Sequence, residues 1–118
     1  MGKKNMIKTA QALRESFKKR EGMSFTFFLQ KSFPAFEGHF PGMPVLPAIV
    51  QLEMALFCIR ILLDKNVSLS EIKRSKFAKP VLPETEIAVE INENGGGCFN
   101  VVIRDEKEVY SQIQLEVS

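Results

Sequence analysis

A histidine and a glutamate that could move protons lie fourteen residues apart in the stretch FEGHFPGMPVLPAIVQLEMA, residues 36–55. His39 is the only histidine in the chain, and an imidazole with an ordinary pKa near ~6.5 is suited to act as a base. Glu53 lies in a long apolar run, where desolvation favours the protonated carboxyl group that a general acid needs. The pair therefore predicts general acid–base chemistry.

Each of the two residues also has an ordinary structural explanation. A lone histidine in a proline-rich loop is commonly a hydrogen-bonded loop residue. A glutamate in an apolar helix commonly faces solvent or pairs with a charge such as Arg60 on a later turn. Elsewhere, no serine has the context of a nucleophile elbow, and NENGGG, residues 92–97, is a turn because no Lys-Ser/Thr or helix follows the glycines.

Two different elements must hold these side chains. Residues 31–47 contain four prolines and two glycines, which excludes a regular helix or a central strand and favours a stiff loop around His39. Pro47 suits the first turn of a helix, where its missing N–H costs nothing. The run AIVQLEMALFCIRILLD that follows is apolar on nearly every side and predicts a helix buried all round.

The rest of the chain reads mainly as strands. Two-residue alternation and β-forming residues predict strands over residues 23–30, 71–79, 84–92, 98–105 and 108–117. Residues 1–20 are ambiguous: Met6, Ala10, Leu13 and Phe17 have helical spacing, but ALRESFK could be the first arm of a hairpin that turns at REG, and we favour the hairpin. One antiparallel sheet wrapped around one long central helix gives an α+β fold.

Composition limits the remaining possibilities. The length of 118 residues predicts a single domain, 1–118, and a net charge of +2 is too small to indicate nucleic-acid binding. The two cysteines lack metal-site spacing, which favours a reduced, cytoplasmic protein with no metal and no cofactor. The window 45–63 is interrupted by Gln51, Glu53 and Arg60, so we expect no membrane span.

The motif GHFPGMPVLPAIVQLEMA resembles the signature of the hotdog-fold 3-hydroxyacyl-[acyl-carrier-protein] dehydratases. Six positions match the family pattern in residue type and spacing. They are His39, Phe40, Pro41, Pro44, Pro47 and Glu53. KFAKPVLPETEI, residues 76–87, resembles a second conserved strand and turn of that family. LPAIVQLEMA is especially similar to the small dehydratases of aryl polyene pathways.

The resemblance implies a hotdog fold, a homodimer with active sites at the interface, and an acyl carrier protein that delivers a 3-hydroxyacyl thioester. It implies that His39 removes the C2 proton and that Glu53 protonates the departing C3 hydroxyl. The backbone N–H of Ala48 would bind the thioester oxygen. The residues implied to contact the acyl group are Phe40, Pro47, Ile49 and Leu52. The product would be a trans-2-enoyl thioester, in fatty acid or aryl polyene type biosynthesis.

Two departures from the family pattern keep alternatives open. Ala48 replaces the usual glycine, which adds a methyl group beside the proposed oxyanion site, and Phe57 replaces a frequent glutamine. A non-catalytic hotdog protein that binds acyl chains or pairs with an active paralogue is one alternative. A hotdog acyl thioesterase is the other, although such enzymes normally lack this H-F-P-G loop.

Overall fold

The computed structural model describes residues 3–36 and 44–118, with side chains from Thr9 onward. Helix α1 (Lys3–Ser16) leads into strands β1 (Phe17–Glu21) and β2 (Ser24–Leu29) and the short 3-10 helix η1 (Pro34–Phe36). Helix α2 (Ala48–Leu63) follows the loop that carries the motif. The chain then forms β3 (Leu69–Phe77), β4 (Thr85–Gly95), β5 (Cys98–Arg104) and β6 (Val109–Val117).

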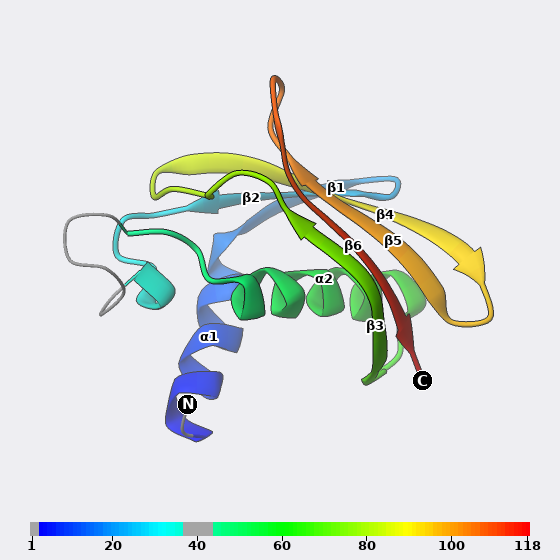
Figure 1. Cartoon of the computed structure of the whole chain (residues 1–118). Coiled ribbons are helices and arrows are strands. Elements are labelled where there is room, and N and C mark those ends of the chain that lie inside the picture. Colours follow the sequence, from blue (N-terminus) through cyan, green and yellow to red (C-terminus); the bar gives the residue numbers. More distant parts are fainter. Residues whose placement is uncertain (1–2, 37–43) are drawn as a thin grey trace.

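The strands form one antiparallel sheet that curves over α2. Its order is β1-β2-β4-β5-β6-β3, so β1 and β3 are the edges. Figure 1 shows α2 lying against the concave face of this sheet, with α1 beside the beginning of α2 and running away from the sheet. The predicted α+β arrangement of one antiparallel sheet around one long helix is confirmed.

Side chains alternate along the central strands, and one set forms the core against α2. Fully buried aromatic and aliphatic residues point inward, among them Phe25 and Phe27 on β2, Ile87 on β4 and Phe99 on β5. Their neighbours in sequence face outward and are less buried, and many of them are polar or charged, such as Thr26, Glu86 and Asn100. This two-residue period is what allowed the strands to be predicted, because one face of each strand packs and the other meets water.

Helix α2 begins where the proline predicted it would. Pro47 has φ −63° and ψ 150°, and its carbonyl oxygen accepts hydrogen bonds from the N–H groups of Val50 and Gln51, both 3.1 Å long. The helix ends at Asp64, which adopts a left-handed conformation with φ 51°. The expectation that the helix is buried all round is wrong on one side, because Ile49 is 53% exposed and Ile61 is also exposed.

The favoured prediction of a hairpin arm within residues 1–20 is wrong up to Ser16, where the alternative helix forms, and correct only from Phe17 onward. Residues 3–16 form α1, and only then does the hairpin begin, with β1 paired to β2 from Phe17↔Phe27 to Glu21↔Ser24. The hairpin turn at Gly22 matches the expected position, but its first arm starts at Phe17. Ala12 and Leu13 on α1 are buried, so tertiary packing of its apolar residues stabilises a helix whose first turn carries no acidic residue.

Candidate active site

Glu53 lies in the second turn of α2 and is half-buried. It shares a helix face with Ile49 and Phe57, which are four residues before and after it. Ile49 is exposed, whereas the Phe57 ring packs against Phe27 on β2. Arg60, the expected partner, instead donates from Nε to the carbonyl oxygen of Val67 at 2.9 Å. Among residues 9–36 and 44–118, no hydrogen bond or ion pair engages the Glu53 carboxyl group.

The start of α2 presents two open backbone amides. Ala48 and Ile49 are the first residues of the helix and are both exposed. Pro47 supplies no side-chain cap, and no acceptor within the described part of the chain takes the N–H of Ala48 or of Ile49. The amino-terminal end of a helix carries partial positive charge, so these groups favour a developing negative charge nearby.

The predicted site residues are only partly described. Pro47, Ala48, Ile49 and Glu53 all lie within the first two turns of α2 or directly before them, while Leu52 is buried. His39 and Phe40 lie outside the described residues. Their relation to Glu53 therefore stays a prediction.

A buried polar pair that the sequence analysis missed lies directly behind the start of α2. The Gln51 side chain donates from Nε2 to the carbonyl oxygen of Leu46 at 3.2 Å, and its Oε1 accepts a hydrogen bond from the hydroxyl of Ser111 on β6. Both side chains are almost fully buried, with 3% exposure for Gln51 and 1% for Ser111. The one available signal was a glutamine in an otherwise apolar stretch.

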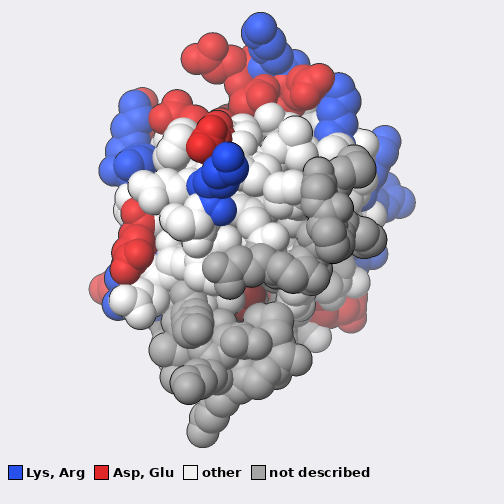
Figure 2. All heavy atoms as spheres, turned by 90° about the vertical axis from the view of Figure 1, so that its left-hand side faces the viewer, with Lys and Arg blue, Asp and Glu red and all other residues white. Residues whose placement is uncertain are grey.

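At the end of the molecule where α2 begins, the centre of the described surface is mostly uncharged. Figure 2 shows that uncharged atoms occupy most of this centre, that a basic and an acidic side chain interrupt them, and that the other charged side chains lie toward the margins. Exposed Leu82 and Ile49 contribute large apolar side chains to the described surface. Such a surface suits an apolar chain better than a polar ligand.

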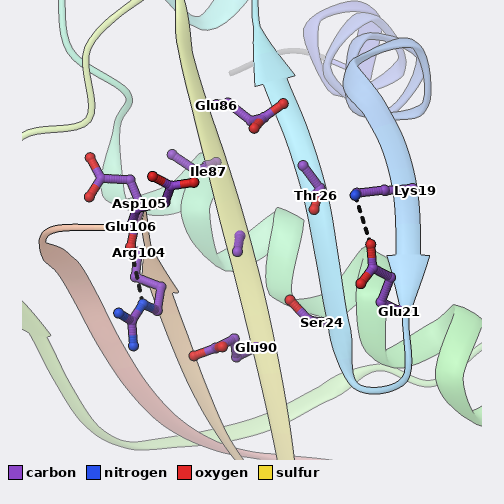
Figure 3. Close-up of a pocket in the computed structure, with 11 residues that line it drawn as sticks. Lys19, Glu21, Ser24, Thr26, Glu86, Ile87, Glu90, Arg104, Asp105 and Glu106 are labelled. Atoms are coloured by element: carbon purple, nitrogen blue, oxygen red, sulfur yellow. Dashed lines mark hydrogen bonds and ion pairs between the residues drawn. The ribbon is translucent and has the colours of Figure 1, made fainter.

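A separate hollow of about 300 Å³ lies on the outer face of the sheet. Figure 3 shows its lining side chains on β1, β2, β4 and the end of β5, with Lys19 and Glu21 joined by an ion pair of 2.7 Å. None of the predicted site residues lines it. It is rich in carboxylates, but no group of three or more metal-ligating side chains occurs within the residues that the structure describes.

Within residues 3–36 and 44–118, neither α1 nor α2 combines the length and the apolar character that a membrane span requires.

Comparison with solved structures identifies the fold. A chain of the dehydratase heterocomplex ApeI:P from Xenorhabdus doucetiae superposes with a TM-score of 0.73 at 23% identity, covering 86% of this chain and 92% of that one. The Escherichia coli PaaI protein superposes with a TM-score of 0.60 at 9% identity, covering 98% of both chains. The fold is therefore the predicted hotdog fold.

Comparison of sequences identifies the family. The 3-hydroxyacyl-[acyl-carrier-protein] dehydratase FabZ of Aliivibrio fischeri is 29% identical over 96 residues, which are 70% of this chain and 64% of the relative. FabZ of Proteus mirabilis is 34% identical over 95 residues, again 70% of this chain and 63% of the relative. The chain thus spans less than two thirds of the length of these relatives. The model of the ApeI-like family, described as ApeI dehydratase, matches residues 15–114, and the chain accordingly belongs to this family of hotdog-fold, FabZ-like dehydratases.

Proposed function

We propose that this protein removes water from a 3-hydroxyacyl thioester carried by an acyl carrier protein and yields the trans-2-enoyl thioester. The observation that carries the proposal is Glu53, a half-buried carboxyl group without a partner among the described residues, near the open amide end of α2. Membership of a dehydratase family supports the reaction class. The motif supplies His39 at the spacing that the family uses.

In the proposed reaction, His39 removes a proton from C2 of the substrate. The electron pair of that C–H bond forms the C2=C3 double bond, the C3–O bond breaks, and Glu53 donates its proton to the departing hydroxyl, which leaves as water. Proton transfer by positioned groups of this kind contributes ~10²–10⁴-fold to a rate. Proton exchange with water then returns both groups to their starting states.

The thioester oxygen gains negative charge when C2 loses its proton. We assign the N–H of Ala48 as the donor that stabilises this charge, since it opens α2 and no described residue accepts from it. Ile49 is exposed beside it. Pro47, Ile49, Leu52 and Phe40 are proposed to contact the acyl group.

A second copy of the chain is proposed to complete the site along strand β3. The register with β6 places Ile72 opposite buried Leu115 and Phe77 opposite buried Ser111, so both side chains point to the inner face. Yet Ile72 is 46% exposed and Phe77 is 42% exposed. The outer edge of β3 has no strand partner among the described residues, and an exposed edge of this kind favours pairing with another chain.

The test is a product analysis with the purified protein and a 3-hydroxyacyl thioester of an acyl carrier protein, followed by mass spectrometry. We expect the enoyl thioester, and we expect it to disappear in the variants His39→Ala and Glu53→Gln. Release of free acid alone would replace the proposal with a thioesterase. Binding of the acyl thioester without either product would indicate a non-catalytic acyl-binding protein.

We further propose an aryl polyene type pathway as the setting, in place of ordinary fatty acid synthesis. The similarity of LPAIVQLEMA, residues 46–55, to the small dehydratases of aryl polyene pathways supports this choice. The measurement is a competition between thioesters with an aryl polyene tail and with a saturated tail. A higher kcat/KM for the saturated substrate would contradict it.

A further inference from the structure

Residues 46–48 form the junction that leads into helix α2. Buried hydrogen bonds from Gln51 hold this junction and connect it to Ser111 on β6. The main-chain N–H of Gln51 donates to the carbonyl oxygen of Pro47, and its side-chain Nε2 donates to the carbonyl oxygen of Leu46. One residue of the helix therefore fixes the two peptide groups that precede Ala48. The orientation of the Ala48 N–H depends on the second of these groups, since that amide is bonded to the Pro47 carbonyl carbon.

Two other elements complete this support. The Ser111 hydroxyl on β6 donates to Gln51 Oε1, which fixes the orientation of the amide group. The N–H of Leu46 donates to the carbonyl oxygen of Val81, in the segment after β3, at 2.8 Å. The junction is thus anchored to the helix, to β6 and to the segment after β3.

Apolar side chains of similar volume could fill the space that Gln51 and Ser111 occupy, so packing alone does not explain why both residues are polar. Burying an amide and a hydroxyl costs free energy unless both are hydrogen-bonded, and here both are. Gln51 is buried while the neighbouring helix positions Ala48 and Ile49 are exposed. The pair therefore lies directly behind the open amides, on the side turned away from the surface.

We propose that Gln51 and Ser111 are positioning residues, which hold residues 46–48 so that the Ala48 N–H meets the substrate in a fixed geometry. The proposal rests on the proposed function for its effect on turnover. Neither residue touches the reacting atoms. Misplacement of a donor by about 1 Å can cost ~10²-fold in rate, so loss of this support is expected to lower kcat.

The test compares variants that are matched in size. Ser111→Thr keeps a hydroxyl, whereas Ser111→Val has nearly the same volume without it. We expect Ser111→Val to lower kcat ~3–10-fold and Gln51→Met to lower it ~10–100-fold, with KM changed less than ~3-fold. Ser111→Thr is expected to keep kcat near that of the unchanged protein.

A control removes a serine hydrogen bond away from the proposed site. The Ser16 hydroxyl at the end of α1 donates to the carbonyl oxygen of Ala12 at 2.7 Å, so Ser16→Ala should leave kcat unchanged. All assays are made on protein shown to be folded by circular dichroism. Equal kcat for the threonine and valine variants, or a normal kcat in folded Gln51→Met, would overturn the proposal.

A second readout does not need activity. In ¹⁵N–¹H correlation spectra, the amide signals of Ala48 and Ile49 should move or broaden in Ser111→Val and Gln51→Met and stay in place in Ser111→Thr. If the unchanged protein has no dehydratase activity, the proposed function fails while this readout still decides the positioning role. Unmoved amide signals in both apolar variants would refute it.

Discussion

At the scale of single residues, the decisive feature is a carboxyl group without a structural partner. Glu53 is half-buried on the same face of α2 as the exposed Ile49, and Arg60, which the sequence suggested as a partner, donates to the carbonyl oxygen of Val67 instead. A residue that stabilises the fold would be expected to use its carboxylate in a hydrogen bond or an ion pair. Glu53 does neither among the described residues, which favours a role in chemistry.

Glu53→Gln should therefore separate activity from stability. We expect turnover to fall at least ~10²-fold because the proton donor is lost. The free energy of unfolding should change by less than ~1 kcal/mol, since no described hydrogen bond is broken. Urea denaturation and steady-state kinetics measure the two effects. Glu90→Gln, a half-buried glutamate on β4, is the matched control, and a loss of stability above ~2 kcal/mol in Glu53→Gln would indicate a structural role.

The only tyrosine in the chain gives a prediction about pH. Tyr110 is buried, and its hydroxyl donates to Asp105 Oδ2 at 2.5 Å. Burial, and then this hydrogen bond, raise the pKa of Tyr110 from 10.0 to about 12. Because the folded state holds the phenol proton more tightly than the unfolded state, this contribution to stability is fully present below pH 10. It is lost as the pH rises toward 12.

A pH jump followed at 295 nm tests the tyrosine directly, since the chain has one tyrosine and no tryptophan. In the first milliseconds after the jump, the phenol of the folded protein should show a titration midpoint near pH 12. In urea, where the chain is unfolded, the midpoint should lie near pH 10. Asp105→Asn removes the acceptor charge and should lower the folded value. A titration midpoint at pH 10 in the folded protein would show that burial and the hydrogen bond to Asp105 do not raise the pKa of Tyr110.

At the scale of elements, the predictable parts were those with local signals. Period-two alternation located the five strands from β2 to β6 to within about two residues at most ends, and Pro47 located the start of α2. The exception is β4, which continues through the predicted NENGGG turn to Gly95. Its pairing with β5 extends to Gly95↔Cys98 across a bulge, so the turn itself is only two residues long.

The parts that the sequence did not reveal depend on contacts between distant residues. Gln51 and Ser111 are 60 residues apart, and nothing in either local pattern indicates that they meet. Helix α1 was uncertain because its spacing fitted both a helix and a hairpin arm, and its packing settles which one forms. Of the candidate site, Glu53 and the helix start were predictable from the motif, whereas the support behind them was not.

The turn between β4 and β5 supports a prediction about glycine. Gly97 has φ +81°, and a β-carbon placed there would lie 2.6 Å from the carbonyl oxygen of Val117. Gly22 in the β1–β2 turn has φ +61°, with open space around it. Gly97→Ala should therefore lower the free energy of unfolding by ~2–4 kcal/mol, and Gly22→Ala by only ~1 kcal/mol. Thermal and urea denaturation compare them, and equal losses would contradict the steric argument.

At the scale of the whole molecule, the proposed site is built from two chains. The inner face of β3 leaves Ile72 and Phe77 exposed, and the outer edge of β3 has no strand partner among the described residues. If two copies meet at their β3 edges about a two-fold axis, each dimer has two equivalent sites. We propose that each site takes His39 from one chain and Glu53 from the other.

This arrangement predicts that two inactive variants restore each other. In a dimer of one His39→Ala chain and one Glu53→Gln chain, one site carries both substitutions and the other carries neither. Random mixing makes half of the dimers mixed, and each has one intact site of two, so ~25% of the unmixed wild-type activity should return. The variants are co-refolded at equal concentration and assayed for the enoyl product. Mixtures of either variant with itself serve as the control. No recovery despite subunit exchange, shown by mass spectrometry of differently labelled chains, would mean that both residues of a site come from one chain.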